Sequence, residues 1–253
     1  MSLIRDTAIL FKHSCRETLR QPVWIFVMLF QPLCYLFLYA PLLKNMAANS
    51  PHAQNFTLDA FLPGLIAMMA FFGTAYVGFS MVDELRAGVI ERLRVTPMSR
   101  VALLLAKTLR DSLVLVIQSI VLVLIAIPFG YHAHLGHMLL GLLVVMLICL
   151  GVAPLSYTIA LLIRSEDALA PIINFVSQPM LLLSGVLLPL IFAPVWIKTL
   201  STFNPLTYAV DALRAIFAGN ITDLVVLQGI GILAAIACLT FWWGRRTFNK
   251  AIS

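Results

Sequence analysis

Charge is scarce in this chain: of its 253 residues only 11% are Asp, Glu, Lys or Arg, whereas soluble domains carry about a quarter of such residues. Hydrophobic residues make up 61% and the mean hydropathy is +0.99. No segment between the long apolar runs approaches the size of a soluble catalytic domain, which has at least about 50 residues. The composition therefore excludes an ordinary soluble enzyme and indicates a polytopic membrane protein.

A nucleotide-binding motif is also missing. A phosphate-binding loop requires Gly-x-x-x-x-Gly-Lys followed by Ser or Thr, because backbone amides and the lysine surround the phosphates. The chain contains no Gly-Lys pair. We therefore expect a non-catalytic subunit that binds no cofactor itself. If nucleotide hydrolysis drives its function, ATP and Mg²⁺ belong to a separate ATPase chain.

Ionisable residues are absent from the midpoints of the predicted spans. This absence argues against a proton-driven carrier, because such a carrier places a costly charge within the membrane for its function. Asp111 comes closest, and it lies beside Lys107 and Arg110 near the start of an apolar run. We expect these three side chains to snorkel toward water or to pair locally. An intramembrane enzyme is disfavoured because the spans offer no set of nucleophile, base and metal ligands.

Metal ligands are poorly placed. The four cysteines are scattered without metal-ligand spacing and are interpreted as packing residues. His132, His134 and His137 cluster in a short predicted loop, but no carboxylate or cysteine accompanies them. Such a cluster is more typical of a polar loop than of a zinc site, so we expect no metal.

Long apolar windows predict six membrane-spanning helices, because a span needs about 20 apolar residues. The window from Ser112 to Ile163 is long enough for two spans and breaks between Pro128 and Gly136. We expect one all-α membrane domain over residues 1–253, without internal repeats. Its predicted spans lie near 22–43, 60–82, 108–129, 138–163, 168–190 and 224–243.

The distribution of Lys and Arg predicts the orientation, since cations are retained on the cytoplasmic side. With the N-terminus inside, every Lys and Arg except Lys44, Lys198 and Arg214 falls on the inner side. We expect a multi-pass protein of the cell membrane with both termini in the cytoplasm. The same bias explains the net charge of +6 without a nucleic-acid partner.

Residues 1–21 predict an amphipathic helix that lies in the interfacial plane of the lipid bilayer. Its apolar residues recur at spacings of three to four, and cations sit beside them along the helix. The apolar stripe consists of Ile4, Ala8, Phe11, Cys15 and Leu19, and the cations are Arg5, Lys12, Arg16 and Arg20.

The segment 83–100, between the second and third predicted spans, is dense in charge of both signs. Retention on the inner side does not require Glu84 and Glu91, which dilute the positive charge. Mixed charges on a short helix that ends at Thr96-Pro97 suit docking into a groove of a soluble partner. A plain cytoplasmic loop is the alternative interpretation.

Two short apolar helices are predicted between the last two spans, over 195–203 and 209–218, with a turn at Asn204-Pro205. Neither is long enough to cross a bilayer. Segment 191–220 therefore predicts a re-entrant hairpin in the outer leaflet, with its irregular backbone buried in protein or facing water.

The fifth predicted span carries three polar residues, Asn174, Ser177 and Gln178, next to Pro179. They could line a substrate path, or they could make hydrogen bonds between packed helices. The sequence leaves both interpretations open.

Two stretches resemble the membrane subunits of type 2 ABC transporters, which include the daunorubicin-resistance permeases. One runs Glu84-x-Arg86-x-Gly88-x-x-Glu91-Arg92-Leu93 and continues to Thr96-Pro97. The other comprises Leu183-Ser184-Gly185 with Pro189, then Pro194-x-Trp196, Asn204-Pro205-Leu-Thr-Tyr208 and Arg214. Each motif alone is weak, but together with the six-span layout they cover nearly the whole chain.

The resemblance implies an ATP-driven exporter in which two membrane subunits, as a homodimer, pair with two ATPase subunits. It implies that segment 83–100 and the N-terminal helix contact the ATPases, and that the outer hairpin shapes an extracellular gate. The coupling residues would be Glu84, Arg86, Gly88, Glu91 and Arg92, and the gate residues Pro189, Pro194, Trp196, Asn204, Pro205 and Arg214. A path of neutral residues favours a hydrophobic or amphipathic small molecule such as a drug. Polysaccharide or lipid-linked cargo, an ion-driven carrier and a non-transporting scaffold are the alternatives.

Overall fold

The computed structural model describes residues 3–20, 22–49, 58–88, 100–131, 135–186 and 193–252. These ranges contain helices and connecting turns but no strand, as the all-α prediction requires. The longer helices are α1 (Leu3–Arg20), α2 (Pro22–Asn49), α3 (Leu58–Ala75), α6 (Arg100–Ala126), α7 (Leu135–Ile163), α8 (Glu166–Leu183) and α11 (Leu224–Ile252). The shorter ones are α4 (Gly78–Arg86), η2 (Ile127–Phe129), α9 (Val195–Ser201) and α10 (Pro205–Phe217).

Five segments in the described ranges are long and apolar enough to cross a membrane. They are Phe26–Leu43, Leu58–Arg86, Val101–Phe129, Gly136–Ile163 and Leu224–Phe248. The remaining predicted span, near 168–190, corresponds to α8, which has 18 residues. Its apolar character is reduced by Glu166 and Asp167 in the first turn and by Asn174 and Gln178 further along. The count of six spans therefore stays a prediction.

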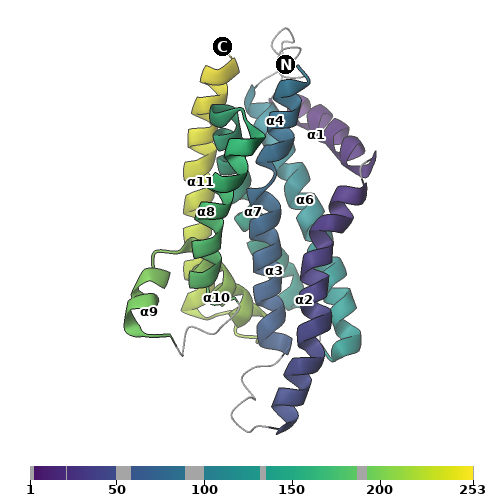
Figure 1. Ribbon diagram of the computed structural model, residues 1–253, viewed down its shortest axis with the longest axis vertical. Helices are drawn as coiled ribbons and strands as arrows, with labels where there is room; N and C mark the ends of the chain where they lie inside the picture. Colours follow the sequence, from purple (N-terminus) through teal and green to yellow (C-terminus); the bar gives the residue numbers. More distant parts are fainter. Residues whose placement is uncertain are drawn as a thin grey trace.

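Helix α7 lies inside the bundle and packs against α3, α4, α6, α10 and α11 (Figure 1). The main core lies between α3, α7 and α10, where Leu65 and Leu213 are fully buried. A second core, formed by Met81, Tyr157 and Phe248, joins α4, α7 and α11. Helix α1 lies beside α6, and α2 packs on α3. Both chain ends lie at the same end of the bundle (Figure 1).

The second predicted span, 60–82, is broken into α3 and α4. The hydroxyl of Ser156 on α7 donates to the carbonyl of Ala75 at 2.6 Å and accepts from the amide of Gly78 at 3.0 Å. These two bonds satisfy backbone groups where the helix is interrupted. A Cβ on Gly78 would lie 2.8 Å from the Ser156 carbonyl oxygen, so only glycine allows this approach.

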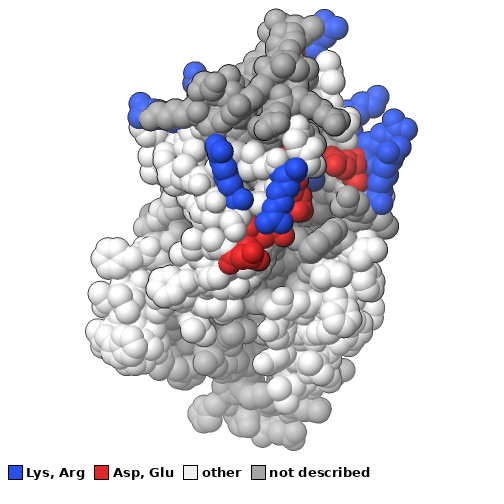
Figure 2. All heavy atoms as spheres, turned by 45° about the horizontal axis from the view of Figure 1, so that its top comes forward, with Lys and Arg blue, Asp and Glu red and all other residues white. Residues whose placement is uncertain are grey.

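Charged side chains gather at the end of the bundle where the termini lie, and the described residues on the lower part of the visible face are uncharged (Figure 2). We call the former the charged end. It is formed by α1, α4, the first turns of α6, the α7–α8 junction and the last turns of α11. Its described cations are Arg5, Lys12, Arg16, Arg20, Arg86, Lys107, Arg110, Arg164, Arg245 and Arg246. The opposite end carries α9 and α10 (Figure 1).

Candidate functional site

The predicted coupling segment begins on α4 at the charged end. The helix ends with hydrogen bonds from the amide of Ala87 to Asp83 O at 2.9 Å and from the amide of Gly88 to Leu85 O at 3.2 Å. Gly88 has φ +67°, in the left-handed region where a helix commonly ends on glycine. A Cβ at this position would meet no atom within 4 Å, so the conformation rather than space requires glycine.

Several predicted residues lie outside the described ranges. They are Glu91, Arg92, Pro189, His132 and His134, with the rest of segment 89–99.

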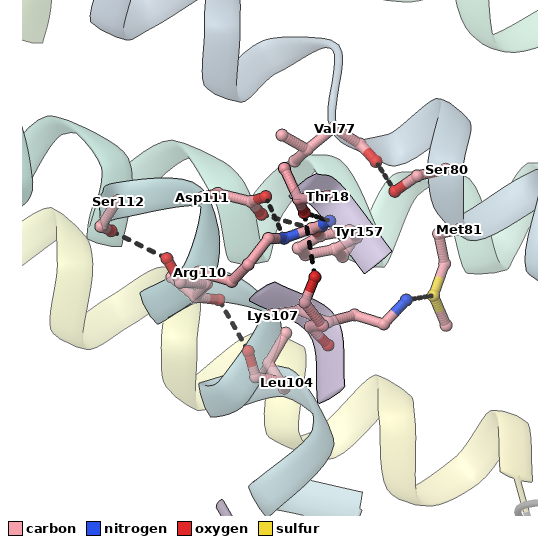
Figure 3. Close-up of polar contacts among 12 residues, drawn as sticks. Thr18, Val77, Ser80, Met81, Leu104, Lys107, Arg110, Asp111, Ser112 and Tyr157 are labelled. Carbon is pink, nitrogen blue, oxygen red and sulfur yellow. Dashed lines mark hydrogen bonds and ion pairs between the residues drawn. The ribbon is translucent and has the colours of Figure 1, made fainter. Parts of the chain in front are cut away.

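Glu84, near the end of α4, forms an ion pair with Lys107 of α6. The Lys107 side chain is only 4% exposed, and that of Glu84 is 22% exposed. The Lys107 ammonium also lies 3.7 Å from the sulfur of Met81 and 5.6 Å from the ring centroid of Tyr157 (Figure 3). Glu84 therefore supplies the carboxylate that balances the positive charge of the nearly buried Lys107.

Asp111 lies one helical turn further along α6 and contacts Arg110 and, on α7, Tyr157. Its carboxylate accepts a hydrogen bond from the hydroxyl of Tyr157 at 2.5 Å and lies 2.9 Å from Nε of Arg110. Arg110 donates to the Tyr157 oxygen at 3.2 Å and to the hydroxyl of Thr18 on α1 at 3.1 Å (Figure 3). These contacts join α1, α6 and α7.

Together these groups form what we call the buried charge cluster: Glu84, Lys107, Arg110, Asp111 and Tyr157. Local pairing was expected for the α6 residues, but snorkelling was wrong, because Asp111 is only 6% exposed and Lys107 is 3% exposed. Helix α6 begins at Arg100, earlier than the predicted span at 108, so these charges lie within the helix and under α1, α4 and α7. Their participation with Tyr157 was not predicted.

Arg86, the last residue of α4, forms an ion pair with Glu166 at the start of α8, with an N–O distance of 2.5 Å. The two side chains are 56% and 33% exposed, so solvent weakens this pair relative to the buried one. Sequence reasoning missed Glu166, although an acidic residue in the first turn of a helix is a recognisable signal. The two pairs connect α4 to both α6 and α8.

At the opposite end, Asn204 and Pro205 begin α10, earlier than the predicted helix start at residue 209. The Asn204 side chain accepts from the amide of Leu206 at 3.0 Å and donates to the carbonyl of Met180 on α8 at 2.6 Å. Pro205 occupies the first helical turn, where its missing amide donor costs nothing. Asn204 is thus both a helix cap and a link to α8.

The two short helices differ in their exposure. Pro194 precedes α9 in an extended conformation, and Trp196 on α9 is 64% exposed. Helix α10 is packed between α3, α7 and α11. Its buried residues are Leu206, Thr207, Ala209, Val210, Ala212, Leu213 and Ile216. Their insertion into a membrane leaflet stays a prediction.

Arg214 of α10 holds two other helices. Its Nε donates to the carbonyl of Ala60 in α3 at 3.2 Å, and its Nη2 donates to the carbonyl of Gly185 after α8 at 2.8 Å. Burial lowers the pKa of Arg214, while the nearby carboxylate of Asp211 raises it. An arginine remains charged at neutral pH, so the guanidinium makes charge-assisted hydrogen bonds to the first turn of α3 and to the turn after α8.

The polar residues of α8 do not share one environment. Asn174 is exposed, and its side-chain oxygen accepts from the hydroxyl of Tyr76 at 2.7 Å. Gln178 is exposed. Ser177 is buried and lines a cleft of about 840 Å³ between α3, α7, α8, α10 and α11, together with apolar residues such as Phe71 and Met180. Only Ser177 of the three borders the cleft.

Known proteins match most of the chain. Residues 5–218 match the family described as ABC-2 type transporter. The transport permease named ycf38 of Cyanophora paradoxa is 26% identical over 85% of this chain and 75% of its own length. The daunorubicin resistance ABC transporter permease protein DrrB1 of Streptomyces coeruleorubidus is 24% identical over 91% and 80%, respectively. These matches confirm the resemblance of the motifs, and the chain belongs to the ABC-2 type transporter family.

Proposed function

We propose that this chain is the membrane-spanning subunit of an ATP-driven exporter whose ATPase is a separate chain. The observation that carries the proposal is the attachment of α4. Its final turn forms ion pairs with α6 through Glu84 and with α8 through Arg86. A partner that moves the following segment therefore moves two long helices.

The buried charge cluster explains why that movement would be concerted. Withdrawing α4 alone would leave Lys107 charged, without Glu84, in a site nearly closed to water. Because Glu84 is partly exposed, breaking this pair costs about 2–3 kcal/mol, less than breaking a fully buried pair. Moving α4, α6, α7 and α8 together leaves every pair intact. In this mechanism the Gly88 turn and segment 89–99, which holds Glu91 and Arg92, contact the ATPase, and α1 follows through Thr18.

The proposed topology has six spans, with α8 as the fifth and the charged end in the cytoplasm. The gathering of cations at that end supports it, because Lys and Arg are retained inside. The protein then lies in a cell membrane with both termini on the cytoplasmic side. Helices α9 and α10 lie on the outer side as the gate, held by Asn204, Pro205 and Arg214, with Pro194 and Trp196 at its exposed edge.

The proposed assembly contains two copies of this chain and two ATPase subunits that bind ATP and Mg²⁺. We propose that the cleft beside Ser177 contributes to the export path. Its lining is almost entirely apolar, which suits a hydrophobic or amphipathic small molecule such as a drug. The Streptomyces relative is named as a daunorubicin resistance permease, which supports the same cargo class. Export of polysaccharide or lipid-linked cargo is the nearest alternative.

A carrier driven by protons is the rival from another class, and Asp111 is the observation that favours it. An ionisable carboxylate within a span is the group such a carrier needs. Here its oxygens contact Arg110 and Tyr157, which favours a structural role.

Purification in mild detergent tests the proposal. We expect a nucleotide-binding chain to co-elute in equal amount. We also expect Glu84→Ala combined with Glu91→Ala to lower export while membrane insertion is retained. Full export by the double variant, or activity of the chain with no co-eluting ATPase, would contradict the proposal. A panel of dyes and drugs tests the cargo class, which would be rejected if none were moved.

A further inference from the structure

Helix α1 leaves a groove against α6 that the coupling mechanism does not use. The groove has an empty volume of about 1130 Å³ and is lined mainly by apolar side chains from three helices, with Thr7 of α1 and Ser112 of α6 as the polar residues in its lining. Its lining includes Ala8 and Phe11 of α1, Leu105, Leu109 and Val116 of α6, and Met146 of α7. The one serine on its α6 wall, Ser112, donates its hydroxyl to the carbonyl of Thr108 at 2.8 Å. The groove therefore suits a hydrocarbon chain.

The length and direction of the groove fit one leaflet of a bilayer. On α6 its lining runs from Leu105 to Val116, which is about 16 Å of helix at 1.5 Å per residue. The hydrocarbon core of a bilayer is about 30 Å thick, so each leaflet contributes about 15 Å. The groove starts at the charged end and runs along a candidate span. It borders Leu113, which is 43% exposed and faces outward from the bundle.

Cations lie along α1 beside the face that lines this groove. Arg5, Lys12 and Arg16 are exposed and, at intervals of seven and four residues, share one face of α1. That face adjoins the face that carries Ala8 and Phe11. A stripe of cations beside an apolar stripe attracts an anionic head group while the chain is buried.

Helix α1 is fixed beside the groove rather than loosely apposed to it. Thr18 accepts a hydrogen bond from Arg110, and Leu10 packs against the second core. Asp6, only 3% exposed, faces the protein rather than the cations. These contacts therefore fix the position of the cations of α1 relative to the walls of the groove.

We propose that this groove binds one acyl chain of an anionic membrane phospholipid, with the head group at Arg5, Lys12 and Arg16. The site does not depend on the proposed export function. A lipid held there fills the space under α1 and anchors α1 at the membrane surface.

Native mass spectrometry of the purified protein tests the site, with phosphatidylglycerol and phosphatidylcholine as probes. We expect one phosphatidylglycerol to be retained per chain in preference to phosphatidylcholine. Each surface cation strengthens such binding about fivefold, so replacing Arg5, Lys12 and Arg16 by Gln should weaken it about a hundredfold. The matched control replaces Arg164, Arg245 and Arg246 by Gln, which removes the same charge elsewhere at the charged end and should leave binding unchanged.

A second pair of variants tests the groove itself. Ala8→Phe places a ring in the groove and should abolish retention of phosphatidylglycerol, whereas Ala168→Phe adds the same ring at an exposed position of α8 outside the groove and should leave retention unchanged. Both variants should elute as folded protein. Equal retention by the two variants, equal retention of both lipids by the unaltered protein, or loss of an oligomer on Ala8→Phe would each overturn the proposal. The last outcome would assign the groove to a second copy of the chain.

Discussion

Removing the Glu84 carboxylate should strand the charge of Lys107. The Lys107 side chain is 4% exposed and Glu84 is 22% exposed, so the pair lies between a buried bridge, whose disruption costs about 3–5 kcal/mol, and a surface bridge worth up to about 1 kcal/mol. We expect Glu84→Ala to cost about 2–3 kcal/mol. Lys107→Met should cost about 1 kcal/mol, because water still reaches the carboxylate that remains.

The double variant should be about as stable as Lys107→Met alone, since neither charge is stranded. The coupling energy of the cycle is then about 2–3 kcal/mol. The assay is thermal unfolding in detergent, monitored by size-exclusion chromatography. By the scaling of soluble domains of this size, Glu84→Ala should lower Tm by about 4–12 °C. Glu17→Ala, an exposed carboxylate on α1, is the matched control. The reasoning fails if Glu84→Ala unfolds like the control, or if the double variant loses the sum of both single losses.

Three further changes test individual contacts. Arg214→Met should cost about 2–4 kcal/mol in unfolding free energy, because two charge-assisted hydrogen bonds to Ala60 and Gly185 are lost. Arg214→Lys should restore little of this loss, since one ammonium group cannot replace the planar guanidinium. Equal Tm values for Arg214→Met and the unaltered protein would refute this. Asn204→Asp should retain the helix cap but lose the bond to Met180, so it should be intermediate in Tm between the unaltered protein and Asn204→Ala, which loses both. Gly88→Ala should lower the unfolding free energy by about 1–2 kcal/mol, because alanine is strained at a φ of +67°. It should also lower export, measured as transport per inserted chain, while membrane insertion is unchanged. Full export would contradict a role for this turn.

The helices themselves could largely be predicted from the sequence, because a bilayer requires long apolar segments. The boundaries could not, because hydropathy treats every charge as a stop. Helix α6 begins at Arg100 and α11 continues to Ile252 through Arg245 and Arg246, since charges within a helix are acceptable once they are paired or reach water. Likewise, no pattern in the sequence of α3 and α4 reveals the break at Gly78, which depends on Ser156 of a distant helix.

In the candidate site, features that depend on the local backbone preferences of a residue were the easier ones to predict. The turn signal at Asn204-Pro205 follows from local conformational rules, but α10 begins there, at Pro205, and not at the predicted residue 209. The helix end at Gly88 was not predicted, because segment 83–100 was expected to hold a short helix that ends at Thr96-Pro97. The buried charge cluster was not predictable, because it depends on which helices pack together. Tyr157 is separated from Asp111 by 46 residues and lies in an apolar run that gives no sign of its hydrogen bond.

Transport by purified components in sealed vesicles tests the central claim most directly. The measurement compares uptake of a drug into vesicles that hold this chain alone with uptake into vesicles that also hold the co-purifying ATPase. The account predicts uptake only when the ATPase and hydrolysable ATP are both present. Uptake by this chain alone, driven by a pH gradient, would contradict it.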